Sequence, residues 1–202
     1  MRRNKVSTDG LEASIIRALE NSIGAEDVEV MDYEFYDDIG GLCFKSSGAN
    51  NEESEWLVAD DEDQAEEMAI ALVTDDLENE PALFDRKWLS QYIYISDTDK
   101  NILIEEERES LEGDVPEDDM TSMLDSYEQG LEDPVQYFVN DTGIFSFEDL
   151  IEASFIQIDI SLASQGAVDT DGVAHFLDKY DGVEEYIEDP ETGDTYIAYG
   201  LS

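Results

Sequence analysis

Hydrophobic positions in the segment 60–80 recur with the spacing of an amphipathic helix. The apolar positions are Ala65, Met68, Ala69, Leu72 and Leu77, and most of the other residues of the segment are acidic. A stripe of this period predicts a helix that packs one face against a core. Asp60 or Asp61 is suited to cap the first turn, where the helix dipole also favours negative charge. The opposite face of this helix is therefore predicted to be an anionic surface.

The hydrophobic pattern of the residues before this acidic helix predicts an α+β unit, in which the acidic helix is the last element. A first helix is expected to begin at Thr8 or Asp9 and to end at a glycine cap, Gly24. Short segments with alternating or apolar patterns predict three strands, at 28–36, 42–45 and 55–59. These strands are expected to form an antiparallel meander.

Between residues 81 and 119 the pattern predicts a short helix, a hairpin and a linker. The helix is expected over 82–91, after Pro81. Segments 92–95 and 102–104 have strand-like composition around a polar turn, which predicts a hairpin. Residues 105–119 are rich in Asp and Glu, and like charges favour an extended linker.

The second half of the chain is predicted to be mostly helical and to end in a hairpin. Helices are expected at 116–127, after the capping residue Asp133, and from a capping box at Ser146 to Gly166. The terminal hairpin is expected from strands at 184–187 and 195–199.

The expected fold class is therefore α+β: an N-terminal helix, a three-stranded antiparallel meander and an acidic helix, then a mostly helical second half with a terminal β-hairpin. The expected organisation is an α+β acidic domain at 1–104, an acidic linker at 105–119 and a helical domain with the hairpin at 120–202.

The net charge of the chain restricts its partners. Asp and Glu number 54 against 10 Lys and Arg, which gives a formal net charge of −44 on 202 residues. A hydrophobic fraction of 41% is enough for a packed core. Repulsion between like charges argues against direct binding to nucleic acid or to an anionic membrane. No segment reaches the roughly 18 apolar residues of a membrane span.

Few residues support catalysis or metal binding. His175 is the only histidine and Cys43 the only cysteine, whereas a zinc site needs three or four nitrogen or sulfur ligands. Asp97-x-Asp99 and Asp169-x-Asp171 lack the remaining oxygen ligands of a calcium loop. We therefore expect no catalytic residue, no metal and no cofactor, and a buried Cys43 thiol in a reducing cytosol.

The motif at 171–182, Asp-Gly-x-x-His-Phe-Leu-x-x-Tyr-Asp-Gly, is followed by the acidic hairpin. It resembles the ending of an uncharacterised family of small acidic proteins of tailed phages. The acidic helix that leads to Phe84 and then Trp88-Leu89 is similar too. This chain has Val173-Ala174 where that family usually has Arg-Gly. The resemblance implies a phage origin and a location in the host cytoplasm, but it supplies no function.

The amount of charge favours a mimic of double-stranded DNA. A charge of −44 equals that of about 75 Å of duplex, or ~22 base pairs. Carboxylates four residues apart on a helix lie about 6 Å from each other, which is comparable to phosphates along a strand. In general character the chain is similar to acidic anti-restriction proteins of phages and plasmids. The hypothesis is an anti-defence inhibitor that occupies the DNA-binding cleft of a basic host protein of a restriction or CRISPR-like system.

The acidic residues expected to contact this partner are Asp60, Asp61, Glu62, Asp63, Glu66, Glu67, Glu78, Glu105, Glu106, Glu107, Glu109, Glu117, Asp118, Asp119, Glu184, Glu185, Glu188 and Asp189. Three alternatives stay open: salt adaptation in a halophile, an acidic adaptor for another basic host protein such as a polymerase subunit, and an enzyme that uses His175. The sequence also leaves a homodimer open.

Overall fold

The computed structural model describes residues 8–31, 41–47, 53–112, 114–178 and 184–201 of the chain. It divides into two compact units. Unit 1 consists of residues 1–75 and 164–202, and unit 2 of residues 76–163. Unit 2 is therefore inserted, in sequence, between two segments of unit 1. This partition differs from the expected domains at 1–104 and 120–202, because the terminal hairpin joins the N-terminal strands.

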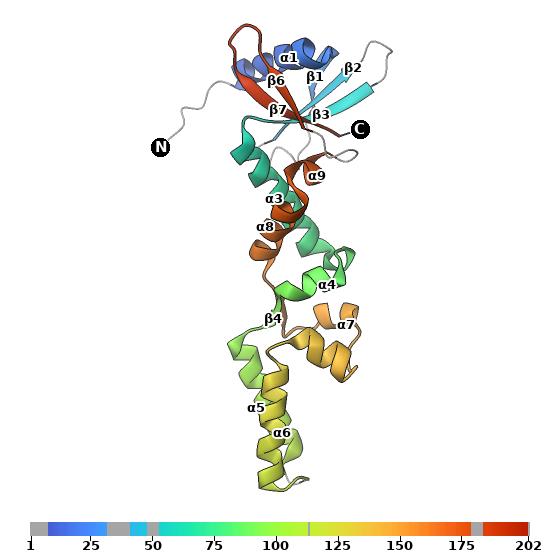
Figure 1. Ribbon diagram of the computed structural model, residues 1–202, viewed down its shortest axis with the longest axis vertical. Helices are drawn as coiled ribbons and strands as arrows, with labels where there is room; N and C mark the ends of the chain where they lie inside the picture. The colour runs from blue at the N-terminus through green and yellow to red at the C-terminus, as the bar shows by residue number, and fades with distance from the viewer. Residues whose placement is uncertain (1–7, 32–40, 48–52, 113, 179–183, 202) are drawn as a thin grey trace, which may run out of the picture. The chain divides into compact units, whose positions relative to one another are not determined.

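Unit 1 is built on a five-stranded antiparallel sheet (Figure 1). Its order is β1 (Glu26–Met31), β2 (Leu42–Ser47), β3 (Glu53–Ala59), β7 (Thr195–Gly200) and β6 (Glu184–Glu188). The predicted meander and terminal hairpin are both confirmed, and β7 pairs with β3 to make one sheet of them. Residues 32–40, with the rest of the predicted first strand and most of its turn, lie outside the described residues.

Helix α1 (Thr8–Ile23) covers one face of this sheet (Figure 1). Its residues Ile15, Ala18 and Leu19 are fully buried, and they pack with Phe44 and Val58 of the strands. Gly24 follows the helix with a φ of +66°, the left-handed conformation of a glycine cap. Burial of this apolar stripe is what holds α1 on the sheet.

The other face of the sheet is also buried. Cys43, Leu57 and Tyr199 occupy alternate positions to the residues that face α1, and each is at most 1% exposed. Figure 1 shows α3 (Glu62–Asn79) and α9 (Val173–Leu177) on this side of the sheet. Both faces of the central strands are therefore covered within unit 1.

The acidic helix α3 has the structure that its pattern predicts. The predicted inward residues Ala65, Met68, Ala69 and Leu77 are at most 1% exposed. The carboxylate of Asp61 caps the helix by accepting a hydrogen bond from the Gln64 amide at 2.8 Å. Within unit 1, α3 also contacts α8 (Ile160–Asp171), where the hydroxyls of Thr74 and Ser164 are 2.8 Å apart.

The predicted hairpin at 92–104 is wrong. Strand β4 (Ile93–Ile95) pairs with β5 (Ile156–Ile158), and residues 97–111 form helix α5 (Asp97–Leu111). The polar segment after β4 is the first turn of this helix rather than a hairpin turn. Ser96 accepts a hydrogen bond from the Asp99 amide at 3.1 Å and donates one to the Asp99 carboxylate at 2.5 Å. This reciprocal cap stabilises the start of a helix.

The predicted linker at 105–119 is wrong as well, because most of this segment is helical. Residues 105–111 complete α5, and residues 117–119 open helix α6 (Glu117–Gly130), which packs against α5. Glu and Arg are good helix formers, and half-buried residues such as Leu103 and Leu111 give α5 an apolar face. Local helix preference and packing therefore outweigh the repulsion between like charges.

The remaining helices of unit 2 are shorter than predicted. The expected helix at 82–91 is split into η1 (Pro81–Leu83), α4 (Arg86–Leu89) and η2 (Ser90–Tyr92). Ser146 caps α7 (Phe147–Ile151) as predicted, but the helix does not reach Gly166. The intervening residues form β5, because Ile156 and Ile158 pair with β4, and the carboxylate of Asp159 then caps α8.

A cluster of aromatic rings forms the core of unit 2 beside these helices. Asp133 accepts a hydrogen bond from the Gln136 amide at 2.9 Å, the predicted cap, and a π-helical segment η3 (Val135–Asp141) follows. Phe138 of η3 contacts the rings of Phe145 and Phe155, with ring centroids 5.7 and 5.6 Å away. Edge-on and tilted contacts of this kind add to the apolar burial.

Candidate functional site

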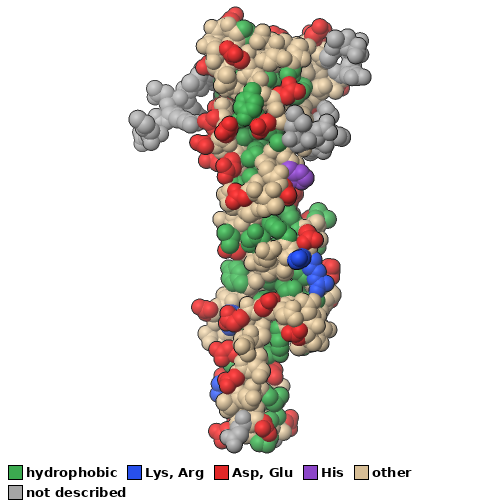
Figure 2. All heavy atoms as spheres, viewed as in Figure 1, with side chains coloured by type: hydrophobic (Ala, Val, Ile, Leu, Met, Phe, Trp, Pro, Cys, Tyr) green, Lys and Arg blue, Asp and Glu red, His purple; other side chains and the backbone are tan. Residues whose placement is uncertain are grey.

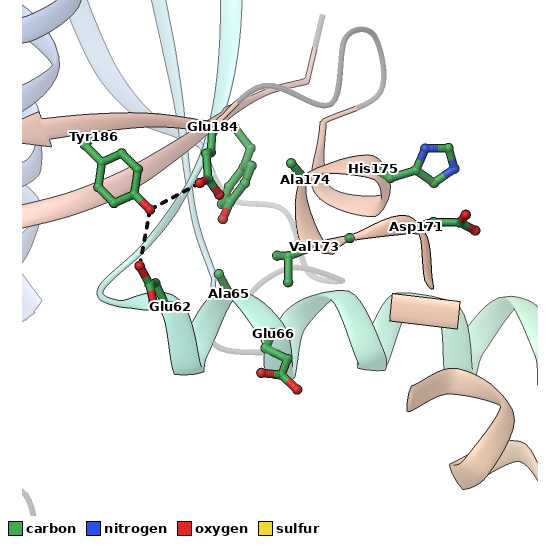
Figure 3. A pocket seen from close by; sticks show the side chains of 11 residues that line it. Glu62, Ala65, Glu66, Asp171, Val173, Ala174, His175, Glu184 and Tyr186 are labelled. Carbon is green, nitrogen blue, oxygen red and sulfur yellow. Dashed lines mark hydrogen bonds between the residues drawn. The ribbon is translucent and has the colours of Figure 1, made fainter. Parts of the chain in front are cut away.

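Unit 1 contains a cavity of about 600 Å³ (Figure 3). It is lined by residues of α3, of the segment that leads into α9, and of the β6–β7 hairpin. Its titratable side chains are those of Glu62, Glu66, Asp171, His175, Glu184, Tyr186 and Tyr199. No Lys or Arg is among the described residues that line it. The cavity is therefore strongly anionic.

The helix period of α3 and the strand period of β6 direct these side chains toward the same cavity. Glu62 and Glu66 are one helical turn apart on α3, so they lie on neighbouring positions of one helix face. Glu184 and Tyr186 are two residues apart on β6, so they lie on one face of the strand. Tyr199 of β7 is the cross-strand partner of Glu184.

The hydroxyl of Tyr186 lies between two carboxylates. It is 3.2 Å from Oε1 of Glu184 and 3.3 Å from Oε1 of Glu62 (Figure 3). The hydrogen bond to Glu184 is the main cause of a raised pKa of Tyr186. Burial raises the pKa of Tyr199 strongly, and the nearby charge of Glu184 adds to the effect. Both phenols therefore keep their protons at neutral pH.

A second polar cluster lies at the end of β6, and it is structural. The carboxylate of Asp189 accepts hydrogen bonds from Ser14 at 2.6 Å and from Arg17 at 3.0 and 2.6 Å. The hydroxyl of Thr192 and the amide of Glu191 donate two more, at 3.0 and 2.9 Å. The hydrogen bonds from Arg17 are the main reason that the pKa of Asp189 is far below its ordinary value.

Asp189 was expected to face a partner, and this prediction is wrong. Its side chain is fully buried beneath α1, where it is not accessible to another protein. The reason is visible in the strand pattern: Ile187 points inward, Glu188 outward and Asp189 inward again. The buried charge is tolerated because it is paired and fully hydrogen-bonded.

Most of the other acids predicted to make contact are exposed. Asp60 and Glu107 are half-buried, and the side chain of Asp118 lies outside the described residues. The exposed ones are Asp61, Glu62, Asp63, Glu66, Glu67, Glu78, Glu105, Glu106, Glu109, Glu117, Asp119, Glu184, Glu185 and Glu188. On the face that Figure 2 shows, acidic side chains occupy separate patches, with other side chains between them.

Of these acids, the cavity brings together only Glu62, Glu66 and Glu184. The acids of α5 and α6 belong to the other unit. The sequence analysis did not predict that Tyr186 and Tyr199 line this cavity. The alternation of Glu184 and Tyr186 on one strand was the available signal.

His175 and Asp99 make local contacts in the structure. His175 is exposed and lies edge-on to the ring of Phe176, with centroids 5.0 Å apart. Among the described residues, no group of three or more His, Cys, Asp or Glu is arranged to hold a metal ion. Asp99 instead serves in the cap of α5.

In the described part of the chain, no helix combines the length and the apolar character needed to cross a bilayer. The cytoplasmic location expected from the sequence stays a prediction.

Searches of curated proteins and of solved structures found no match to this chain. One family model does match, that of the ATP synthase regulation protein NCA2, over residues 60–169. The matched segment is more than half of the chain and runs from the start of α3 through most of α8. It includes the whole of unit 2.

This match overturns the functional reading of the sequence. The assignment to a tailed-phage family is wrong, and its motif at 171–182 lies outside the matched segment, partly on residues that are not described. The DNA-mimic and anti-restriction hypothesis, with its basic DNA-binding host partner, is wrong too, and the match gives no support to salt adaptation or to an acidic adaptor. Net charge concerns solubility and long-range steering, and it does not identify a partner. The chain belongs to the family of the ATP synthase regulation protein NCA2.

Proposed function

We propose that this protein takes part in the regulation of ATP synthase, and that it acts by binding rather than by catalysis. The observation that carries the proposal is the match of residues 60–169 to the family model of an ATP synthase regulation protein. Because the matched segment encloses unit 2 and only part of unit 1, we assign the regulatory contact to unit 2.

Exposed apolar side chains in unit 2 support this assignment. Ile102 on α5 is 51% exposed and Met123 on α6 is 46% exposed. Leu83 and Ile144 are more exposed still. Single exposed apolar residues are ordinary on a protein surface, but apolar residues and methionine are also the usual centre of a protein interface. The two helices offer such residues among exposed acids, which suits a contact with an apolar centre and a polar rim.

The surroundings of His175 support binding over catalysis. No described side chain is hydrogen-bonded to its imidazole, and the residue lies outside the matched segment. A histidine that acts as a general acid or base is normally held in place by a hydrogen-bonding partner. The replacement His175→Ala is therefore expected to leave the function intact.

The test is deletion of the gene in the organism that carries it, followed by complementation with full-length variants. The measurements are the amount of assembled ATP synthase on native gels and the ATP hydrolysis rate of isolated membranes. Deletion is expected to change at least one of these, and the wild-type gene to restore it. If both stay at wild-type values after deletion, the proposal of regulation is rejected.

A matched pair of variants tests the assignment to unit 2. The double variant Ile102→Ser/Met123→Ser should fail to complement, whereas Val30→Thr should complement fully. Val30 is a suitable control because it is 45% exposed and lies outside the matched segment. Exposed substitutions of this kind usually change stability by no more than about 0.5 kcal/mol, so both proteins should stay folded. Full complementation by the double variant would refute the assignment, and failure of His175→Ala would refute a non-catalytic role.

A further inference from the structure

Arg86 and Lys87 of α4 differ from the other basic residues that the structure describes. Each of the others forms an ion pair with a carboxylate: Arg17, Lys45, Lys100 and Arg108. Within the described ranges neither Arg86 nor Lys87 forms one, although the chain has 54 Asp and Glu against 10 Lys and Arg. Both residues are exposed. Two adjacent cations therefore lack a counter-charge in a very acidic protein.

The acidic residues on the neighbouring segments do not neutralise these cations. Asp85 caps α4 by accepting a hydrogen bond from the Trp88 amide at 2.8 Å. Asp149 accepts one from the Ser146 hydroxyl at 2.7 Å. Glu148 is exposed and forms no ion pair with either cation. The carboxylates that are closest in sequence thus leave the two cations available to another molecule.

The guanidinium of Arg86 is held in place by uncharged groups. Its Nη2 donates a hydrogen bond to Oδ1 of Asn140 at 3.3 Å, and its central carbon lies 5.2 Å from the centroid of the Phe147 ring. A guanidinium has five N–H donors in one plane, and Asn140 takes one of them. A carboxylate can accept two parallel hydrogen bonds from such a group. Arg86 is therefore oriented in advance and still has donors to offer.

The most exposed large apolar side chains of the described residues lie on the segments that Arg86 connects. Ile144 is 65% exposed and lies in sequence between Asn140 and Phe147, the two residues that Arg86 contacts. Leu83 is 74% exposed and belongs to η1, which packs against α7. Arg and apolar residues together are typical of protein interfaces. We call this set the Arg86 surface: Leu83, Arg86, Lys87 and Ile144.

We propose that the Arg86 surface binds an acidic segment of a partner protein, in which Asp or Glu stands beside apolar residues. The carboxylates pair with the two cations, and the apolar side chains cover Leu83 and Ile144. Charges are screened over about 8 Å at physiological ionic strength, so the more distant acids of the chain repel such a segment only weakly. An anionic membrane fits less well, because a bilayer is broad and would also meet exposed acids.

This inference rests on the proposed function, because the surface lies in unit 2 and within the segment that matches the family model. It adds the chemistry of a partner of that unit. The Arg86 surface belongs to η1, α4 and the segment before α7, whereas Ile102 and Met123 belong to α5 and α6. The binding test below needs no ATP synthase. Its failure would reject the acidic partner alone, and failure of the gene deletion would reject regulation.

The experiment is a selection of displayed random peptides on the full-length protein at about 0.15 M salt. The wild type is compared with Arg86→Gln/Lys87→Gln. The matched control is Lys45→Gln/Arg108→Gln, which removes the same two charges from cations that already have carboxylate partners. Non-specific attraction of basic peptides to the acidic chain is equal in the two double variants, so the comparison removes it.

The peptides that the wild type and the control variant select, and that Arg86→Gln/Lys87→Gln does not, are expected to contain Asp or Glu beside apolar residues. In solution such a peptide should bind the wild type at least about tenfold more tightly than this double variant. Leu83→Ser should weaken binding as well.

Two further variants address the fold and the geometry. Lys87→Glu changes a side chain that forms no hydrogen bond or ion pair within the described ranges, so it tests the surface even if loss of the contact between Arg86 and Phe147 disturbs α4. It should also weaken binding. Arg86→Lys keeps the charge but loses the planar donors, so it should bind the peptide more weakly than the wild type does.

Selection of the same peptides by all three proteins would overturn the proposal, because it would show binding to other surfaces. Peptides that depend on Arg86 and Lys87 but lack acidic residues would overturn it too. Equal weakening by the control variant would reduce the effect to net charge. If vesicles with phosphatidylserine bind the wild type and not Arg86→Gln/Lys87→Gln, while no acidic peptide does, the surface recognises a membrane and the proposal is rejected.

Discussion

Arg17 and Asp189 form a two-point ion pair between residues that are 172 positions apart in the sequence. The distances are 3.0 Å from Nε to Oδ1 and 2.6 Å from Nη2 to Oδ2. The Asp189 side chain is fully buried, whereas that of Arg17 is 30% exposed. The pair connects α1 to the turn between β6 and β7, so it joins the first helix of unit 1 to its terminal hairpin.

Loss of Arg17 should destabilise the protein more than loss of a surface cation. Arg17→Met leaves a buried carboxylate without its counter-charge, which is costly. Lys45→Met is the control, because the pair between Lys45 and Glu53, at 2.8 Å, is exposed to solvent and such pairs contribute little. In urea unfolding, the shift in midpoint should be at least about twofold larger for Arg17→Met. Equal shifts in midpoint would show that the pair between Arg17 and Asp189 stabilises the protein no more than an exposed ion pair does.

The stabilising effect of Asp189 should depend on pH in a defined direction. Hydrogen bonds from Arg17, and then from Ser14, hold the pKa of Asp189 well below its ordinary value, although burial alone would raise it. A carboxylate with a lowered folded-state pKa contributes stability above its unfolded-state pKa of about 4, and this contribution is lost as the pH falls toward the folded-state pKa.

The measurement is the difference in unfolding free energy between the wild type and Asp189→Asn. A difference is needed because the other carboxylates of the chain titrate in the same range. It should be constant from about pH 5 to 8 and should shrink below about pH 4. Urea unfolding monitored by circular dichroism supplies both values. A difference that grows toward acid would contradict the structural role of this carboxylate.

Replacing an acidic residue by Lys should have opposite effects on the stability of the protein at the two ends of α3. Glu78 lies in the last turn, which contains no basic residue, and Asp63 lies in the first turn. Glu78→Lys should raise stability, because a cation is favourable at the negative end of the helix dipole, by about 0.3–1 kcal/mol at low salt. Asp63→Lys should lower it by a similar amount.

Both variants change the net charge equally, so the comparison separates helix position from overall repulsion. Thermal unfolding at low ionic strength is the measurement. If both replacements stabilise the protein by the same amount, the effect comes from the lower net charge and the position in the helix has no influence.

The cap of α5 should matter because this helix contains no fully buried residue. Ser96→Ala removes the hydroxyl that bonds the Asp99 amide, and loss of such a cap costs about 0.5–2 kcal/mol. Ser110→Ala, at an exposed position near the other end of α5, is the control and should have little effect. Amide hydrogen exchange of α5 should accelerate in Ser96→Ala alone. Unchanged exchange would mean that packing against α6 is sufficient to hold the helix.

The sequence predicted those elements whose formation depends on local pattern. The stripe of α3, the glycine cap after α1 and the strands of the terminal hairpin are all present. The prediction of a hairpin turn at residues 97–101 was wrong because a polar segment after a short strand is compatible both with a hairpin turn and with the first turn of a helix. The partner of β4 decides between them, and that partner is β5, far along the chain. Local periodicity carries no information about such a choice.

The candidate site was harder to predict, because it depends on which acidic side chains come close together in the folded protein. Glu62 and Glu184 belong to elements that are distant in sequence, and the total charge of the chain is the same whether they meet or not. Glu188 and Asp189 are neighbours of similar chemistry, yet one is exposed and the other fully buried. Strand alternation distinguishes them once the strand is extended by one residue.

The position of β7 in the sheet has a consequence for synthesis on the ribosome. All of unit 2 has been translated before β6 and β7, so it is complete in sequence while β3 still lacks its second neighbour. Until β7 emerges, the nascent chain carries an unpaired strand edge beside the apolar residues Leu57 and Val58, and such edges favour pairing with other chains. Unit 1 can close its sheet only after β7 has been translated, and a nascent-chain chaperone would be most useful before that point.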